Sequence, residues 1–138
     1  MTLSLIHISA LGDDGASGVL NPAGFGRLAR GEISFTHAQG VDDMIQQNLM
    51  MAFPTLNGTW AVRWSRVDYG SFPGQDAQGN PLGEVEAKDQ WIQLAYGRSL
   101  INQTWVGASV NYVNQSLYTE TIHGPFVDLG GLLSLIHI

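Results

Sequence analysis

The chain contains no cysteine and carries little charge. Its 138 residues include six Lys and Arg against twelve Asp and Glu, and charged residues make up 13% of the total. Without cysteine there is no disulfide framework, no thiolate zinc site and no cysteine nucleophile. The net charge of −6 removes the basic footprint that nucleic-acid binding requires. We therefore expect no nucleic-acid partner.

Two kinds of hydrophobic segment are also missing. No apolar run approaches the roughly 18 residues of a membrane-spanning helix. No basic segment followed by an apolar one opens the chain, so no secretory signal is visible. Even so, hydrophobic residues amount to 44% and the mean hydropathy is +0.02, which is too apolar for a disordered chain. The length predicts one domain.

The hexapeptide LSLIHI occurs twice, at residues 3–8 and 133–138. Nothing between the copies shares a period with them, which disfavours a structural repeat, although a pair of capping strands is the alternative. The hexapeptide matches the translation of a common transposase sequencing adapter. We interpret residues 1–8 and 133–138 as adapter-derived and leave their histidines out of every functional argument. The remainder is then a fragment that lacks its signal peptide.

Apolar and polar residues alternate with a period of two from residue 32 onward, and this pattern predicts β-strands with two different faces. The alternating runs span residues 32–36, 45–53, 59–65, 91–96, 105–112 and 126–132. We expect an all-β protein: an antiparallel meander of about six strands over residues 32–132, open at both edges. Residues 9–31 show no strand pattern. They predict a short helix over Ala16–Leu20 and a turn at Asn21-Pro22.

The connections between these runs alternate in length. Residues 54–58 and 98–103 are short turns, whereas 69–88 is a long loop and 113–124 an intermediate one. Short turns on one side and longer loops on the other are typical of outer-membrane barrels. A soluble sandwich also alternates apolar and polar faces and is the alternative.

Two features favour the incomplete transmembrane barrel over the sandwich. The polar faces carry mostly small or uncharged residues, and aromatic residues near the strand ends form two levels, as in interfacial girdles. One level comprises Phe53, Trp60, Tyr96 and Trp105, and the other Trp64, Tyr69 and Tyr112. The expected lumen-facing residues are Arg63, Gln93, Ser109, Asn111 and Asp128. The two charged members, Arg63 and Asp128, are expected to belong to an ion-pair network that braces the barrel or, alternatively, to contact a transported or secreted partner.

A family resemblance extends this interpretation. Residues 13–39, DDGASGVLNPAGFGRLARGEISFTHAQ, resemble the start of the PorV/PorQ family of outer-membrane proteins, which are relatives of the FadL-like transporters. The motif residues are Asn21, Pro22, Ala23 and Gly24, followed by the basic Arg27 and a first strand at Glu32 to His37. The similarity continues, in order, through residues 68–84, 94–100 and 126–133.

The resemblance implies a barrel in the outer membrane of a Gram-negative-type bacterium, in contact with its lipid, of which this chain supplies the first six or so strands. The small-residue segment would act inside the lumen. The implied function is transport of hydrophobic molecules or, through secretion-machinery partners, type IX protein secretion. The alternative is a soluble or extracellular β-domain that binds a partner through the 69–84 loop.

No motif of the sequence predicts an enzyme. Asp76, Gln78, Asn80 and Glu84 lack the full spacing of a calcium loop. His37 and His123 lie far apart and outside any zinc-ligand spacing, and no nucleophile elbow is present. Asp13-Asp14 has the composition of an exposed loop, and the glycines of residues 24–31 lack the spacing of a phosphate-binding loop. We therefore expect no catalytic, metal or cofactor site.

Overall fold

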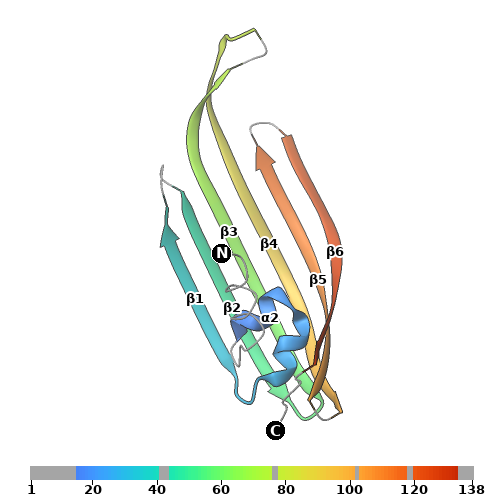
Figure 1. Ribbon diagram of the computed structural model, residues 1–138. Helices are drawn as coiled ribbons and strands as arrows, with labels where there is room; N and C mark the ends of the chain where they lie inside the picture. The colour runs from blue at the N-terminus through green and yellow to red at the C-terminus, as the bar shows by residue number, and fades with distance from the viewer. Residues whose placement is uncertain (1–14, 41–43, 76–77, 102, 118–119, 134–138) are drawn as a thin grey trace, which may run out of the picture.

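The computed structural model describes residues 15–40, 44–75, 78–101, 103–117 and 120–133 (Figure 1). The expected adapter segment 1–8 and most of its second copy, residues 134–138, lie outside the described residues, as do Asp13, Asp14 and Asp76. Leu133, the first residue of the second copy, is the last residue of a strand.

A short helical segment precedes six strands within the described ranges. The elements are α2 (Gly15–Leu20), the 3-10 helix η1 (Pro22–Arg27), β1 (Glu32–Gln39), β2 (Ile45–Thr55), β3 (Gly58–Gln75), β4 (Pro81–Ile101), β5 (Thr104–Leu117) and β6 (Glu120–Leu133). The strands form one sheet in chain order, and every neighbouring pair is antiparallel. The sheet is not closed, because β1 and β6 form its two edges. The expected all-β meander is confirmed.

The two long connections differ from expectation. Residues 71–75 pair with residues 81–86, so β3 and β4 continue as a two-stranded ribbon that projects beyond its neighbours (Figure 1). Likewise β5 and β6 extend to Leu117 and Glu120. Glycine and proline hide the alternation in the ribbon. They are tolerated there because both strands are edges, where a proline need not donate a ladder hydrogen bond.

The N-terminal segment folds as two short helices instead of a helix and a turn. The first helix begins at Gly15, close to the expected Ala16. Asn21 and Pro22 then start η1: the Asn21 side-chain oxygen accepts a hydrogen bond from the Ala23 backbone N–H at 3.1 Å, and Pro22 stands at the start of the helix. Proline suits this position because its missing N–H has no partner in a first helical turn.

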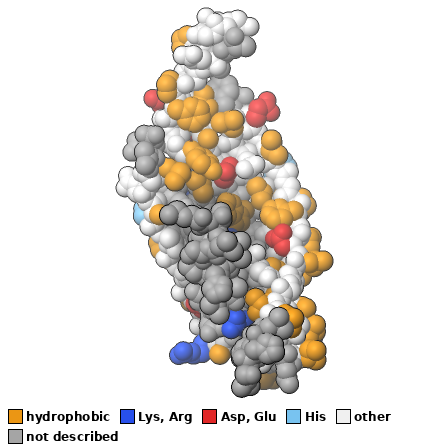
Figure 2. Space-filling view, viewed as in Figure 1, with side chains coloured by type: hydrophobic (Ala, Val, Ile, Leu, Met, Phe, Trp, Pro, Cys, Tyr) orange, Lys and Arg blue, Asp and Glu red, His pale blue; other side chains and the backbone are white. Residues whose placement is uncertain are grey.

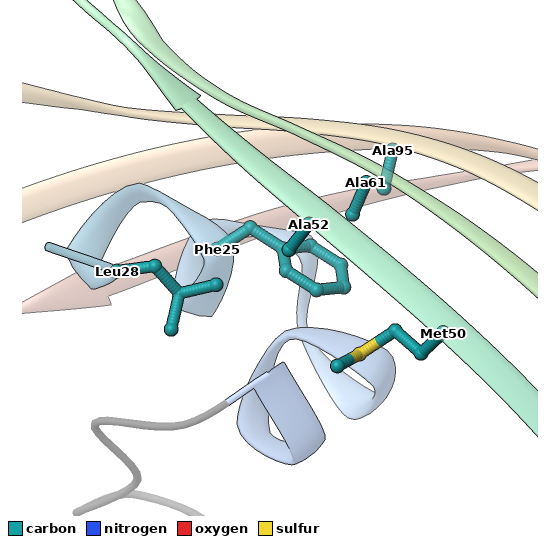
Figure 3. Close-up of a cluster of buried hydrophobic side chains, with 6 residues drawn as sticks. All are labelled: Phe25, Leu28, Met50, Ala52, Ala61 and Ala95. Carbon is teal, nitrogen blue, oxygen red and sulfur yellow. The ribbon is translucent and has the colours of Figure 1, made fainter. Parts of the chain in front are cut away.

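The helical segment packs on one face of the sheet, near the end with the short turns (Figure 1). We call this the covered face and the opposite side the open face. A small hydrophobic core lies between the segment and the sheet (Figure 3). It consists of Phe25, Leu28, Met50, Ala52, Ala61 and Ala95. Three of the four sheet residues are alanines, so the helical segment can approach the strands closely.

Candidate functional site

A row of glycines on the covered face forms the seat of the N-terminal segment. Gly97 pairs with Gly107 and Gly107 with Gly130, so the row crosses β4, β5 and β6. A Cβ atom at Gly97 or Gly107 would collide with the backbone of Pro22, and one at Gly130 would collide with Asn21. Glycine inside a strand often marks such a close approach of another backbone. The sequence carried this signal, but the pairing of the three glycines was not foreseen.

Polar contacts at both sheet edges hold the segment on this seat. Asn21 donates a hydrogen bond through its side-chain nitrogen to the Gly131 carbonyl on β6 at 3.0 Å. The Gly15 backbone N–H donates to Glu32 on β1 at 2.8 Å. The Arg27 guanidinium lies 5.1 Å from the centre of the Trp105 ring, a distance that permits a cation–π interaction. The segment thus connects the first strand with the last.

The five polar residues singled out in the sequence share the covered face. Arg63, Gln93 and Asn111 stand opposite one another on β3, β4 and β5, and Ser109 stands opposite Asp128. Figure 2 shows this face, on which hydrophobic, uncharged polar and a few charged side chains are interspersed. Whether the face lines a lumen stays a prediction.

Four of these residues form one hydrogen-bond network. Asp128 accepts from the Asn111 amide at 2.8 Å and from the Ser109 hydroxyl at 3.2 Å. Gln93 donates to Ser109 at 3.3 Å. The Gln93 side-chain oxygen is buried without a hydrogen-bond partner among the described residues. Because Asn111 and Gln93 are both buried, this network braces β4, β5 and β6 on the covered face.

Arg63 stands apart from that network. Its guanidinium donates to the Asn48 side-chain oxygen at 3.2 Å, and Ser65 donates to the same oxygen at 2.6 Å. It also lies 5.0 Å from the centre of the Trp91 ring. Within the described residues Arg63 makes no ion pair with Asp128, because each has other partners. Whether either charge belongs to an ion-pair network of a complete lumen stays a prediction. The neutral amide of Asn48 and the aromatic ring of Trp91 take the place of a carboxylate beside Arg63.

The open face carries three consecutive rows of apolar side chains, which we call the apolar band. The register defines the rows as Phe35, Leu49, Trp64, Ile92 and Tyr112; then Ile33, Met51, Val62, Leu94, Val110 and Val127; then Phe53, Trp60, Tyr96, Ala108 and Leu129. Many of these side chains are exposed, with Val110 at 55% and Leu129 at 83%. Nothing in the described part of the chain covers the apolar band.

Aromatic residues bound the apolar band at both ends. Phe53, Trp60 and Tyr96 share the row nearest the short turns, where the Trp60 and Tyr96 ring centres lie 4.7 Å apart. Trp64 and Tyr112 lie in the row at the other end, on either side of Ile92. These positions agree with the expected levels.

Two aromatic residues were assigned to these levels wrongly. Trp105 lies on the covered face beside Arg27, because it is two residues from Gly107 and alternation places both on the same side. Tyr69 lies beyond the apolar band, where its hydroxyl donates to Asp89 at 2.9 Å. This hydrogen bond, together with partial burial and the carboxylate charge, raises the pKa of Tyr69.

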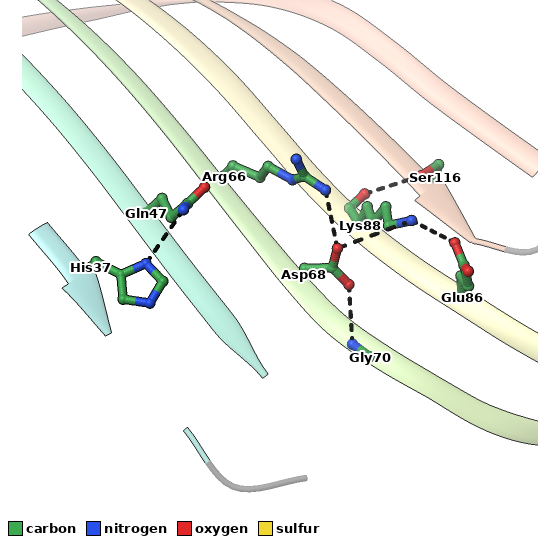
Figure 4. A network of polar contacts seen from close by, with 8 residues as sticks. All are labelled: His37, Gln47, Arg66, Asp68, Gly70, Glu86, Lys88 and Ser116. Atoms are coloured by element: carbon green, nitrogen blue, oxygen red, sulfur yellow. Dashed lines mark hydrogen bonds and ion pairs between the residues drawn. The ribbon is translucent and has the colours of Figure 1, made fainter. Parts of the chain in front are cut away.

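A row of polar residues follows the apolar band on the side of the β3–β4 ribbon. We call it the polar belt, and it takes one residue from each strand: His37, Gln47, Arg66, Gln90, Asn114 and His123. His37 and Gln47 are 3.3 Å apart through ring and amide nitrogens (Figure 4). Gln47 interrupts the apolar alternation of residues 45–53. The structure gives the reason: Gln47 lies where the apolar band ends.

The polar belt adjoins a charged cluster. Arg66 donates to Asp68 at 3.1 Å, and Lys88 lies 4.0 Å from the same Asp68 oxygen and 2.5 Å from Glu86 (Figure 4). The hydrogen bond to Glu86 is the main cause that raises the pKa of Lys88, with further contributions from the charges of Glu86 and Asp68. Lys88 is therefore protonated throughout the neutral range.

The remaining sequence candidates that the structure describes lie at the β3–β4 connection and in the ribbon. Gln78 and Asn80 lie between β3 and β4, and Glu84 stands opposite Pro73 in the ribbon. The described residues contain no group of three His, Asp or Glu side chains placed to hold a metal ion. Neither α2 nor η1, the helices of the described chain, is long and apolar enough to span a membrane.

Comparisons with known proteins add no relative: no protein-family model, curated protein or solved structure matches this chain.

Proposed function

We propose that this sheet is part of the wall of an outer-membrane β-barrel, and that the N-terminal segment plugs its lumen. The apolar band on the open face is the observation that carries the proposal. A contiguous apolar surface bounded by aromatic residues and then by a polar row is unfavourable in water. The same order of residues is favourable when acyl chains cover the apolar rows and headgroups contact the polar one.

The opposite face supports the same arrangement. It bears buried amides, hydroxyls and charged groups, which suit a water-filled or plugged interior. In a barrel, lipid-facing and lumen-facing residues alternate along every strand. From β2 to β5 the residues of the open and the covered face alternate in the same way. The two unpaired edges, β1 and β6, require further strands for closure, because a spanning sheet cannot leave backbone groups unpaired in lipid.

Within this proposal the protein carries hydrophobic molecules across the outer membrane of a Gram-negative-type bacterium. The resemblance of residues 13–39 to the PorV/PorQ family supports this assignment, and the seat of Gly97, Gly107 and Gly130 supports a plug at that motif. Type IX protein secretion is the second function that the resemblance implies. In that case the projecting β3–β4 ribbon is the element best placed to contact cargo.

The test compares two substitutions on the same strand and the same face. Val110 lies in the apolar band and Asn114 in the polar belt, and both side chains are exposed. We expect Val110→Arg to abolish assembly when the complete coding sequence is expressed in a Gram-negative host, because arginine costs roughly 2–4 kcal/mol near the bilayer midplane. Asn114→Arg should assemble normally. The measurement is the amount of folded protein in the outer-membrane fraction.

A soluble domain predicts a different outcome. Unsubstituted protein in the soluble fraction, with both variants equally tolerated, would contradict the barrel. It would favour a β-domain that binds a partner through residues 69–84.

A further inference from the structure

A small groove opens on the open face directly beyond the apolar band. Its volume is about 260 Å³, and Arg66, Lys88, Gln90, Asn114 and Ser116 line it, with Asp89. Three of these residues lie two positions from the last apolar row on their strands, on its ribbon side: Arg66 beside Trp64, Gln90 beside Ile92 and Asn114 beside Tyr112. A molecule in the groove can therefore also lie against the apolar band. We call this the belt groove.

Asp68 brings two cations together at the belt groove. One of its oxygens accepts from Arg66 at 3.1 Å and lies 4.0 Å from Lys88, while the other accepts from the Gly70 backbone N–H at 3.2 Å. The Arg66 and Lys88 side chains remain 43% and 38% exposed. A guanidinium carries five N–H donors and an ammonium three, so both cations keep donors for a ligand.

The chemistry of the belt groove fits a phosphate attached to a hydroxyl-rich group. Two adjacent cations with outward donors are suited to phosphate oxygens. Asp68 and Glu86 match these two cations in number, and Asp89 also lines the groove, so net charge does not favour a bare polyanion. The amides of Gln90 and Asn114 can both donate and accept, and such groups are suited to sugar hydroxyls.

We propose that the belt groove binds the phosphorylated sugar headgroup of a membrane glycolipid whose acyl chains lie on the apolar band. This inference rests on the proposed membrane barrel and names a lipid partner for one region of it. Outer-membrane barrels carry their longer connections on the extracellular side. The β3–β4 ribbon therefore places the belt groove at the outer leaflet.

The experiment uses the complete protein, purified from the outer membrane and exchanged into detergent. Its probes are lipid A, dephosphorylated lipid A and phosphatidylglycerol, and native mass spectrometry measures the bound fraction of each. We expect lipid A to bind most tightly. The double variant Arg66→Gln with Lys88→Gln should lose about tenfold or more in affinity, because hydrogen bonds between charged groups are the strong ones.

Arg98→Gln is the matched control. Arg98 lies on the open face of β4 as Lys88 does, but beyond the other end of the apolar band, and its loss should leave the affinity unchanged. A second variant, Asn114→Leu, removes a donor of the belt groove without disturbing the ion pairs. It should weaken lipid A binding while the protein still assembles.

Three results would overturn the inference and leave the barrel intact: equal binding of phosphorylated and dephosphorylated lipid A, equal binding of lipid A and phosphatidylglycerol, or unchanged affinity in both the double variant and Asn114→Leu. Failure of the unsubstituted protein to reach the outer membrane would instead overturn the proposed function itself. The two failures are therefore distinguishable.

Discussion

The two faces of the same sheet differ in what covers them. On the covered face, alanines and glycines leave room for the N-terminal segment, and polar side chains pair with one another. On the open face, large apolar side chains point outward, and no segment of the described residues covers them. Alternate residues of one strand point to opposite faces. The contrast between the faces therefore appears in the sequence as an alternation with a period of two. It shows that the two faces of the sheet differ in chemical character.

Interactions on the two faces also differ in kind. On the covered face, close backbone approach and directed hydrogen bonds hold the N-terminal segment and the polar side chains in place. The addition or removal of a single atom should therefore change the stability of this face. The apolar band depends on the hydrophobicity of its side chains more than on specific contacts between them. Substitutions of one large apolar residue for another should therefore be tolerated there.

Gly107→Ala should have the largest effect on the covered face. The added Cβ would meet the backbone at Pro22 and Ala23, and neither backbone can move without lifting the segment. Such overpacking costs up to about 3 kcal/mol. Limited proteolysis should therefore cut the N-terminal segment of the variant faster than that of the unsubstituted protein.

Gly131→Ala is the matched control for this substitution. Gly131 lies on the open face of β6, where a Cβ atom would meet nothing within 4 Å. In Gly131→Ala, protease should cut the N-terminal segment at the same rate as in the unsubstituted protein. Equal cleavage rates for Gly107→Ala and the unsubstituted protein would contradict the seating of the segment on the glycine row.

Asp128→Leu should have a smaller effect on the same face. It removes the acceptor of the Asn111 amide and of the Ser109 hydroxyl, leaving a buried donor unpaired at a cost of about 2 kcal/mol. Asp128→Asn keeps an acceptor oxygen and should cost less. The measurement is the free energy of unfolding in urea, and equal losses in the two variants would show that the hydrogen bonds do not stabilise this face.

Tyr69 should give the smallest and most local effect. Its raised pKa reflects the hydrogen bond to Asp89, which stabilises the neutral phenol. That stabilisation is present below pH about 10 and is lost as the pH rises through the raised pKa. In Asp89→Asn the pKa of Tyr69 should fall back toward its ordinary value. The phenolate absorbance measured during an alkaline titration gives the shift. The absorbance of the Tyr69→Phe variant is subtracted to remove the signal of the other tyrosines.

The sequence predicted the six strands and the side to which most of their residues point, because alternation depends only on local order. It missed the β3–β4 ribbon, where glycines and prolines interrupt the alternation although pairing continues. It also missed the glycine row. Gly97, Gly107 and Gly130 become neighbours only through the register of three strands, and register depends on contacts that are distant in the chain.

The sequence predicted which polar residues share the covered face, but it did not predict which residues they contact. Arg63 and Asp128 were expected to belong to an ion-pair network. In the described residues Arg63 lies on Trp91, and Asp128 accepts from neutral groups. A charge inside a protein can be satisfied by a carboxylate, by amides or by an aromatic ring. The sequence alone does not distinguish these partners, because the choice depends on which strand lies opposite.

The most direct test of the central claim uses the absence of cysteine from the chain. Single variants Val110→Cys and Asn114→Cys, labelled with a fluorophore in the complete protein in lipid vesicles, report the surroundings of the apolar band and of the polar belt. We expect brominated lipid to quench the label at residue 110 and aqueous iodide to quench the label at residue 114 more strongly. If iodide quenches both equally, or if neither quencher reaches residue 110, the apolar band does not face lipid.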